Sequence, residues 1–242
     1  MKTVIITVIL LLSFLEVRPQ TDLNQIILSG EIKNTKSKQI IIRNNFWDPT
    51  DTLQLLNGQF RDTLTLSQGY YYLVHEKAQI RFYLNAGSDI VLNFDLKDVV
   101  NTTNWKGIGK NENNYLASKF RLTQNIPFEK RMYSEYAQLN EPAFLAQTDS
   151  IYQLYVIHFQ NNKNDLDHKF TYLEENSIKI QNALRIAQYQ SIKRLVDENP
   201  AFKVSEIYPN AFKDIDLNNP DFMQTYSYQD LMTSYFFIGY EC

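Results

Sequence analysis

The sequence predicts an α+β protein, in which an N-terminal antiparallel β-sandwich or open barrel is followed by an antiparallel helical domain. Apolar residues alternate with period two between Gln25 and Leu96, and turn residues separate the short apolar segments. From Asn111 onwards the period changes to about 3.6, which is the repeat of an amphipathic helix. We therefore expect a signal peptide at 1–20, a β domain at 21–105 and a helical domain at 106–242.

The amino-terminal segment has the pattern of an export signal. Lys2 precedes an apolar run of about 13 residues, shorter than the ~20 that a bilayer span requires, and the run ends before Glu16. An uncleaved membrane anchor is the alternative interpretation. No later segment is apolar enough to span a membrane. We expect an exported protein of the bacterial periplasm or cell envelope, with no integral membrane span after signal removal.

Charge and cysteine content exclude several functional classes. The net charge is −3, so the chain has no basic field that would attract nucleic acid. Cys242 is the single cysteine, which excludes an internal disulfide, a Cys-x-x-Cys redox pair and a thiolate zinc cluster. We expect no cofactor and no metal.

The first half of the chain contains seven segments with strand character. Asn57-Gly58 lies between two of them, and this dipeptide is the strongest short-range signal for a hairpin with a type I′ turn. The sequence therefore predicts that the flanking segments pair. The expected strands are 26–32, 39–43, 52–56, 59–64, 70–74, 80–84 and 90–94.

Four aromatic residues of the β half are candidate ligand-binding residues. Trp47, Tyr71, Tyr83 and Trp105 would form a stacking surface for a glycan or a peptide if they shared one exposed face. The alternative, which we favour, is that these rings pack across neighbouring strands. His75 is expected to be a surface histidine at a strand end rather than a metal ligand.

The second half is predicted to contain five helices, near 113–127, 128–139, 142–159, 167–199 and 218–237. Along the longest helix, residues spaced by three and four share one face, which should pack against the helix at 142–159. These residues are Phe170, Leu173, Ser177, Ile180, Leu184, Ala187 and Ser191. The buried side expected for the last helix consists of Phe222, Tyr226, Leu231 and Tyr235.

Polar patterns in this half do not define a catalytic or metal site. The segment Gly107-x-Gly109-Lys110 lacks the spacer and the hydroxyl residue of a phosphate-binding loop, so we interpret it as a turn that leads into a helix. The cluster Asp165, Asp167 and His168 lacks the glycine and the terminal glutamate of a calcium loop. Asp167 is instead expected to cap the following helix.

The remaining polar candidates have structural interpretations. Glu174 and Glu175 are expected on a solvated face, and His158 is expected to be a hydrogen-bonded core histidine. No Ser-His-Asp or Cys-His set can be nominated from spacing.

A series of short motifs follows the order found in one protein family. The motifs are Ile27-x-Ser29-Gly30-x-Ile32, Leu56-Asn57-Gly58-x-Phe60, Leu66-x-x-Gly69-Tyr70-Tyr71, Leu84-x-Ala86-Gly87-x-Asp89-Ile90 and the segment 107–116. The helical half matches more loosely, mainly at 216–220. This order resembles the N-terminal region of exported bacterial thioredoxin-like thiol-disulfide interchange proteins, in which a β domain and a helical segment precede a thioredoxin domain.

The resemblance implies an accessory role. The activity of that family depends on a Cys-x-x-Cys pair, which has no counterpart here, so none of its catalytic residues can be transferred. We expect a non-catalytic module, not an enzyme, truncated before the catalytic domain, whose partner is a thioredoxin-like domain or a second copy. The alternatives are a cell-envelope ligand-binding protein that uses the aromatic residues and a hydrolase with an unrecognised site.

Overall fold

The structure is a computed structural model, and it describes residues 24–124 and 134–238. It confirms the predicted fold class, with a β-rich N-terminal part followed by a helical part and with 44% helix and 28% strand. Within the described ranges, no helix combines the length and the apolar character that crossing a membrane requires.

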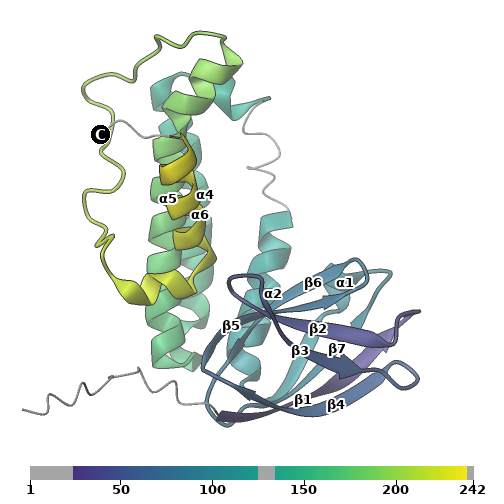
Figure 1. Cartoon of the computed structure of the whole chain (residues 1–242). Coiled ribbons are helices and arrows are strands. Elements are labelled where there is room, and N and C mark those ends of the chain that lie inside the picture. The colour runs from purple at the N-terminus through teal and green to yellow at the C-terminus, as the bar shows by residue number, and fades with distance from the viewer. Residues whose placement is uncertain (1–23, 125–133, 239–242) are drawn as a thin grey trace, which may run out of the picture.

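The β part consists of two four-stranded sheets packed face to face (Figure 1). One sheet has the order β4-β1-β7-β8 and the other has the order β3-β2-β5-β6. Neighbouring strands are antiparallel, except that β1 and β7 are parallel. The strands are β1 (Asn24–Lys33), β2 (Gln39–Asn44), β3 (Pro49–Gln54), β4 (Gln59–Leu66), β5 (Gly69–His75), β6 (Ala78–Leu84), β7 (Asp89–Asp95) and β8 (Asn104–Ile108).

The alternation of apolar residues fills the space between the sheets. Along β7, for example, Ile90, Leu92 and Phe94 are buried while the residues between them are partly exposed. Because side chains of a strand point alternately to its two faces, one face of each sheet supplies the core. The period-two prediction is confirmed for the strands on both sides of this core.

The Asn57-Gly58 turn has the backbone conformation predicted for it, but the two strands that it joins do not pair with each other. Its φ angles of 54° and 80° are both positive, as a type I′ turn requires. However, β3 and β4 lie in different sheets, and only an isolated bridge between Leu56 and Gln59 connects the flanks. The predicted pairing is wrong, because β4 pairs along its length with β1 and the turn carries the chain from one sheet to the other.

The segment before the first long helix is also more regular than predicted. Val99–Thr102 forms the short helix α1, which Asp98 caps, and Asn104–Ile108 is the strand β8. Of the turn predicted at 107–110, Gly109 is in a turn and leads into α2 at Lys110, whereas Gly107 lies in β8. Gly107 has a φ of +89°, and a Cβ atom there would lie 2.1 Å from the carbonyl oxygen of Asp89. Glycine therefore allows β8 to approach β7 closely.

The helical part is a column of three long helices, and α2 (Lys110–Gln124) rises beside it from the sandwich (Figure 1). The column contains α4 (Glu141–Asn162), α5 (His168–Val196) and α6 (Tyr226–Ile238). Short 3-10 turns occupy Tyr136–Gln138, Lys163–Asp165 and Pro220–Gln224. The first half of the helix predicted at 128–139 lies outside the described residues, and the described half, 134–139, forms turns and a 3-10 helix rather than an α-helix.

The burial predicted for one face of the longest helix is confirmed, but its partner is only partly the predicted one. The first part of the face packs with α4, whereas Ile180 and Leu184 pack against the 3-10 turn at 220–224 and α6. Phe170, Leu173, Ser177, Ile180 and Leu184 are buried along α5, while the last two positions of the predicted face, at 187 and 191, are partly buried. Asp167 caps the helix by accepting a hydrogen bond from the backbone N–H of Phe170, as predicted.

The last helix departs from its predicted buried face at one position. Phe222 and Leu231 are buried, but Tyr226 is 54% exposed. The prediction treated 218–237 as one helix, whereas a 3-10 turn ends at Gln224 and α6 begins at Tyr226. The helical phase is therefore reset between Phe222 and Tyr226. The side chain of Tyr235 is not among the side chains that the structure describes.

Two tyrosines from the sandwich join the core of the helical part. Tyr70 and Tyr83 lie on the outer face of the β5–β6 pair, where their rings contact Phe170 of α5 with centroid distances of 5.8 and 4.9 Å. Tyr115 of α2 packs against the same phenylalanine at 5.7 Å. An aromatic cluster therefore joins the two parts, and it leaves the rest of the outer face of β6 uncovered beside α2.

Candidate binding groove at the junction

The start of α2 is fixed to the edges of both sheets by two consecutive asparagines. The side chain of Asn113 accepts a hydrogen bond from the N–H of Tyr83 at 2.7 Å and donates one to its carbonyl oxygen at 2.9 Å. Asn114 makes the same pair of bonds with the backbone of Trp105, at 3.1 and 2.9 Å. Tyr83 lies in β6 and Trp105 lies in β8, which are the edge strands on the same side of the sandwich.

The two preceding side chains attach α2 to the helical column. Asn111 donates a hydrogen bond to the carbonyl oxygen of Asp165 at 2.8 Å. The buried carboxylate of Glu112 accepts one from the N–H of Asp167 at 2.8 Å, just before α5 begins. Four consecutive side chains therefore connect both sheets to the α4–α5 connection.

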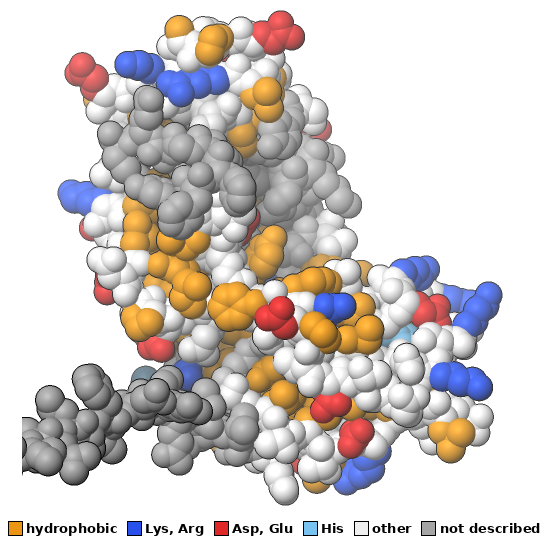
Figure 2. Space-filling view, in the orientation of Figure 1, with side chains coloured by type: hydrophobic (Ala, Val, Ile, Leu, Met, Phe, Trp, Pro, Cys, Tyr) orange, Lys and Arg blue, Asp and Glu red, His pale blue; other side chains and the backbone are white. Residues whose placement is uncertain are grey.

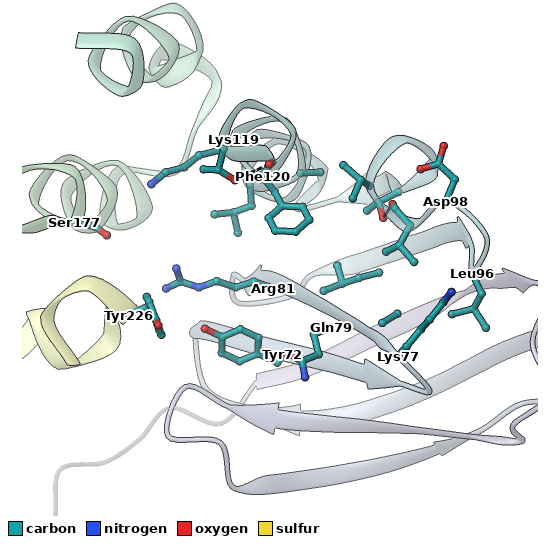
Figure 3. A pocket seen from close by; sticks show the side chains of 18 of the residues that line it. Tyr72, Lys77, Gln79, Arg81, Leu96, Asp98, Lys119, Phe120, Ser177 and Tyr226 are labelled. Atoms are coloured by element: carbon teal, nitrogen blue, oxygen red, sulfur yellow. Dashed lines mark hydrogen bonds between the residues drawn. The ribbon is translucent and has the colours of Figure 1, made fainter. Parts of the chain in front are cut away.

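A groove of about 930 Å³ lies beside this junction. Figure 3 shows α2 with Phe120 on one side, β6 with Gln79 and Arg81 on the other, and Ser177 and Tyr226 at one end. In Figure 2, hydrophobic side chains gather where the helical column meets the sandwich. The apolar lining comes from four elements or their flanks and consists of Ala78, Ile80, Leu96, Val99, Val100, Leu116, Ala117 and Phe120.

The charged groups that line the groove are mostly cationic. They are Lys77, Arg81, Lys97 and Lys119, with Asp98 as the one acidic residue of the described lining. This local excess of positive charge contrasts with the net charge of −3 for the whole chain. A cleft with low-dielectric walls strengthens such a field, so the groove favours an anionic ligand.

A buried carboxylate lies behind the groove. Glu174 of α5 is 1% exposed, accepts a hydrogen bond from the Tyr115 hydroxyl at 2.9 Å and forms an ion pair with Lys119. The prediction that Glu174 faces solvent is therefore wrong, whereas Glu175 is about half exposed and pairs with Lys179. Burial, together with the Glu174 carboxylate, raises the pKa of Tyr115 and of Tyr70, so both phenols remain protonated.

The four predicted aromatic site residues do not share an exposed face. Tyr71 and Trp105 are buried between the sheets around Phe82, with ring centroids 5.9 and 5.6 Å from it, and Tyr83 is buried in the junction cluster. Trp47 is 42% exposed at the tip of the β2–β3 loop. Its ring packs edge-on against Tyr72 at 5.1 Å, and Tyr72 lines the groove.

His75 is buried, so the prediction of a surface position is wrong. Its Nε2 lies 2.6 Å from the Thr35 hydroxyl, and its Nδ1 lies 2.8 Å from the Gln39 carbonyl oxygen. The neighbouring Glu76 carboxylate accepts hydrogen bonds from the backbone N–H groups of Lys36 and Ser37, which lower its pKa. These bonds hold the connection between β1 and β2 rather than shaping a cavity.

His158 agrees with its prediction of a hydrogen-bonded histidine, although it is only partly buried. Its Nε2 lies 3.0 Å from the Ser118 hydroxyl, and its ring stacks on Tyr115 at 5.1 Å. Burial lowers the pKa of the imidazole. In the described part of the chain, no group of three or more His, Cys, Asp or Glu side chains is arranged to hold a metal ion.

The groove itself was missed by the sequence predictions, because its walls come from segments far apart in the chain. The sequence nevertheless contained a pattern that indicates the junction beside the groove. The motif at 107–116 contains four consecutive polar residues, 111–114, at the start of a helix, and their side chains make the junction. Side chains at four consecutive helical positions point in different directions around the helix axis. Polar residues at all four therefore indicate that the helix contacts neighbouring elements on several sides.

Comparisons with protein-family models, with curated proteins and with solved structures find no match to this chain.

Proposed function

We propose that the chain is a non-catalytic accessory module of an exported thioredoxin-like thiol-disulfide oxidoreductase, and that it acts by holding a partner in the junction groove. The observation that carries this proposal is the groove of about 930 Å³ with an apolar lining and cationic margins. Preformed concave sites with a few convergent polar groups are the usual form of binding sites.

The motif that supports the resemblance also builds this site. Asn111 and Glu112 bond the α4–α5 connection, while Asn113 and Asn114 bond the two sheet edges. The helix that follows provides Leu116, Lys119 and Phe120 to the groove wall. A segment that fixes the two parts and shapes the groove suits a module that presents a rigid surface to a redox domain.

Insulin reduction by the purified 242-residue chain tests the absence of catalysis. We expect no turnover above that of the dithiothreitol blank, because a single thiol cannot form an intramolecular disulfide. The Cys242→Ser variant is the control. Turnover that this variant abolishes would contradict the non-catalytic assignment.

Binding of a separately purified thioredoxin-like domain tests the groove. Phe120→Glu places a charge on the apolar wall and should weaken binding by about tenfold or more. Leu154→Glu is the matched control, because Leu154 is 44% exposed on α4 and Phe120 is 48% exposed on α2. Equal binding by both variants in calorimetric titrations would show that the thioredoxin-like domain contacts a surface other than the groove.

A second candidate function is the binding of a peptide or glycan ligand in the cell envelope. It is favoured by the groove volume, which lies within the ~300–1,000 Å³ typical of ligand sites, and by Tyr72 in the lining. The chain has two tryptophans, so Trp105→Phe leaves Trp47, beside Tyr72, as the only source of tryptophan emission. A saturable fluorescence change with a peptide or glycan supports this candidate, and a panel without any change removes it.

A further inference from the structure

Strand β6 forms one edge of its sheet, and its outer edge is only partly closed. Its inner edge pairs with β5 from Ala78 to Leu84. On the outer side, the Asn113 side chain bonds both the N–H and the carbonyl oxygen of Tyr83. Because antiparallel pairing directs the backbone groups of alternate residues to opposite edges, Gln79 and Arg81 direct theirs to the same side as Tyr83.

These outward backbone groups have no hydrogen-bond partner within the described ranges, and both residues line the groove. Proteins usually cover or blunt a sheet edge, since unpaired N–H and C=O groups invite another strand. Here the side chains of Asn113 and Asn114 cover the edges at Tyr83 and Trp105. The stretch of β6 at Gln79 and Arg81 is left open beside the groove.

The groove suits a strand laid along this edge. Figure 3 shows α2, with Phe120, facing β6 across the open space. Arg81 lies at the middle of β6 and Lys77 just before its first residue, on opposite sides of the groove in this view. An added strand would point its side chains alternately to the two faces of the sheet. The apolar wall formed by Val99, Leu116 and Phe120 would contact one of these two rows.

The charges of the groove indicate which strand would fit. The guanidinium of Arg81 lies 4.1 Å from the ring centroid of Tyr70, and its buried Nε has no acceptor among the described residues. Lys77 and Lys97 add positive charge at the other end. Lys119 is already paired with Glu174, and Asp98 caps α1. Lys97 lies close enough to Asp95 to lower the pKa of that carboxyl. Lys77 and Arg81 form no salt bridge within the described residues, and they would attract carboxylates.

We infer that the groove receives an extended acidic peptide segment of a partner protein, which adds to the open edge of β6 as a further strand. This inference rests on the proposal that the groove is a binding site. Backbone hydrogen bonds to Gln79 and Arg81 would hold the segment, and a carboxylate paired with the Arg81 guanidinium would set its register.

A capped peptide of alternating valine and glutamate, about six residues long, is a suitable probe. We expect saturable binding to the whole chain, weakened by salt, and slower exchange of the Gln79 and Arg81 amide hydrogens in NMR spectra. The same peptide with alternate backbone nitrogens methylated keeps its charges but cannot pair along an edge. It should bind at least about tenfold more weakly.

Charge is tested with Arg81→Gln, which should weaken binding by about fivefold. Arg61→Gln is the matched control, because Arg61 is an exposed strand residue outside the groove. A peptide with lysine in place of glutamate should bind more weakly than the acidic one. Equal affinities for both peptides would overturn the acidic character of the segment.

Several results would overturn the inference while leaving the groove as a binding site. One is equal binding of the methylated peptide, and another is binding without protection of the Gln79 and Arg81 amides. Protection that rises with protein concentration alone would identify a second copy of this chain as the occupant. If no peptide binds up to ~1 mM but a partner domain still distinguishes Phe120→Glu from Leu154→Glu, only the strand-addition inference fails.

Discussion

Asn113 and Asn114 are adjacent in the chain, yet each serves the edge of a different sheet. Each side-chain amide has an acceptor oxygen and two N–H donors, so the oxygen and one N–H can replace a neighbouring strand at one residue. Asn113 also donates to the carbonyl oxygen of Gly109 at 2.8 Å. The sequence showed a run of polar residues here, but the partners, Tyr83 and Trp105, could not be read from it.

Asn113→Ala should therefore lower the free energy of unfolding by about 2–4 kcal/mol, because it leaves the N–H and carbonyl oxygen of Tyr83 without their partner. Urea denaturation measures this change. Asn111→Ala removes a single bond of an exposed side chain and should stay within about 0.5 kcal/mol of the parent protein. A larger loss for the Asn111 variant than for the Asn113 variant would contradict the assigned roles.

Residue burial was the least predictable property of polar side chains. Glu174 was expected in solvent, although it lies between Leu173 and Ser177 on the predicted apolar face of α5. Its helical position was a usable signal, but its partner Lys119 comes from α2, which no local pattern indicates. His75 is buried for a similar reason, because its partners Thr35 and Gln39 lie far earlier in the chain.

His158 should make stability depend on pH. Burial holds the pKa of its imidazole below the ordinary value of about 6.5, so the folded state binds a proton less readily than the unfolded chain. The contribution of this group is present above pH ~6.5 and is lost as the pH falls through its folded pKa. The charged groups that influence it are Lys119 and Glu174.

In urea titrations at pH 7 and at about pH 5.5, His158→Gln should lose less stability between the two conditions than the parent protein. His168→Gln removes an exposed imidazole and is the matched control. If the His158 variant keeps the full pH dependence of the parent protein, the imidazole is not the group responsible.

At the scale of elements, local patterns predicted most strands and helices but not all of their partners. The Asn57-Gly58 turn forms with positive φ at both residues, since a two-residue signal is local. The strands that this turn connects belong to different sheets, because β4 pairs with β1 while β3 pairs with β2. The strand β8 was missed because Gly107 and Gly109 suggest a turn unless the close approach to β7 is known.

The long helix α5 gives a direct test of face assignment. Leu184 is buried against Phe222, Tyr228 and Leu231, so Leu184→Ala should lower the free energy of unfolding by about 2–5 kcal/mol. Leu195→Ala, on the same helix, truncates a side chain that is 67% exposed and should change it by less than about 0.5 kcal/mol. Similar losses for the two variants would show that the buried face is misassigned.

At the scale of the whole molecule, the groove exists because α2 is fixed to both parts. The sequence predicted two parts with a boundary between residues 105 and 106, a position that lies within β8, and the two parts share an aromatic cluster. The aromatic residues predicted as a site lie mostly in cores, and the apolar and cationic residues of the groove were not selected. A site made by segments from β5 to α6 can be recognised only in the tertiary structure.

The central claim is that β6 carries an open edge within this groove, and amide hydrogen exchange of the free protein by NMR tests it most directly. We predict that the amide of Tyr83, which Asn113 covers, exchanges slowly, while those of Gln79 and Arg81 exchange much faster. Equal and slow exchange at all three residues would mean that the edge is already covered, and it would contradict the open edge that strand addition requires.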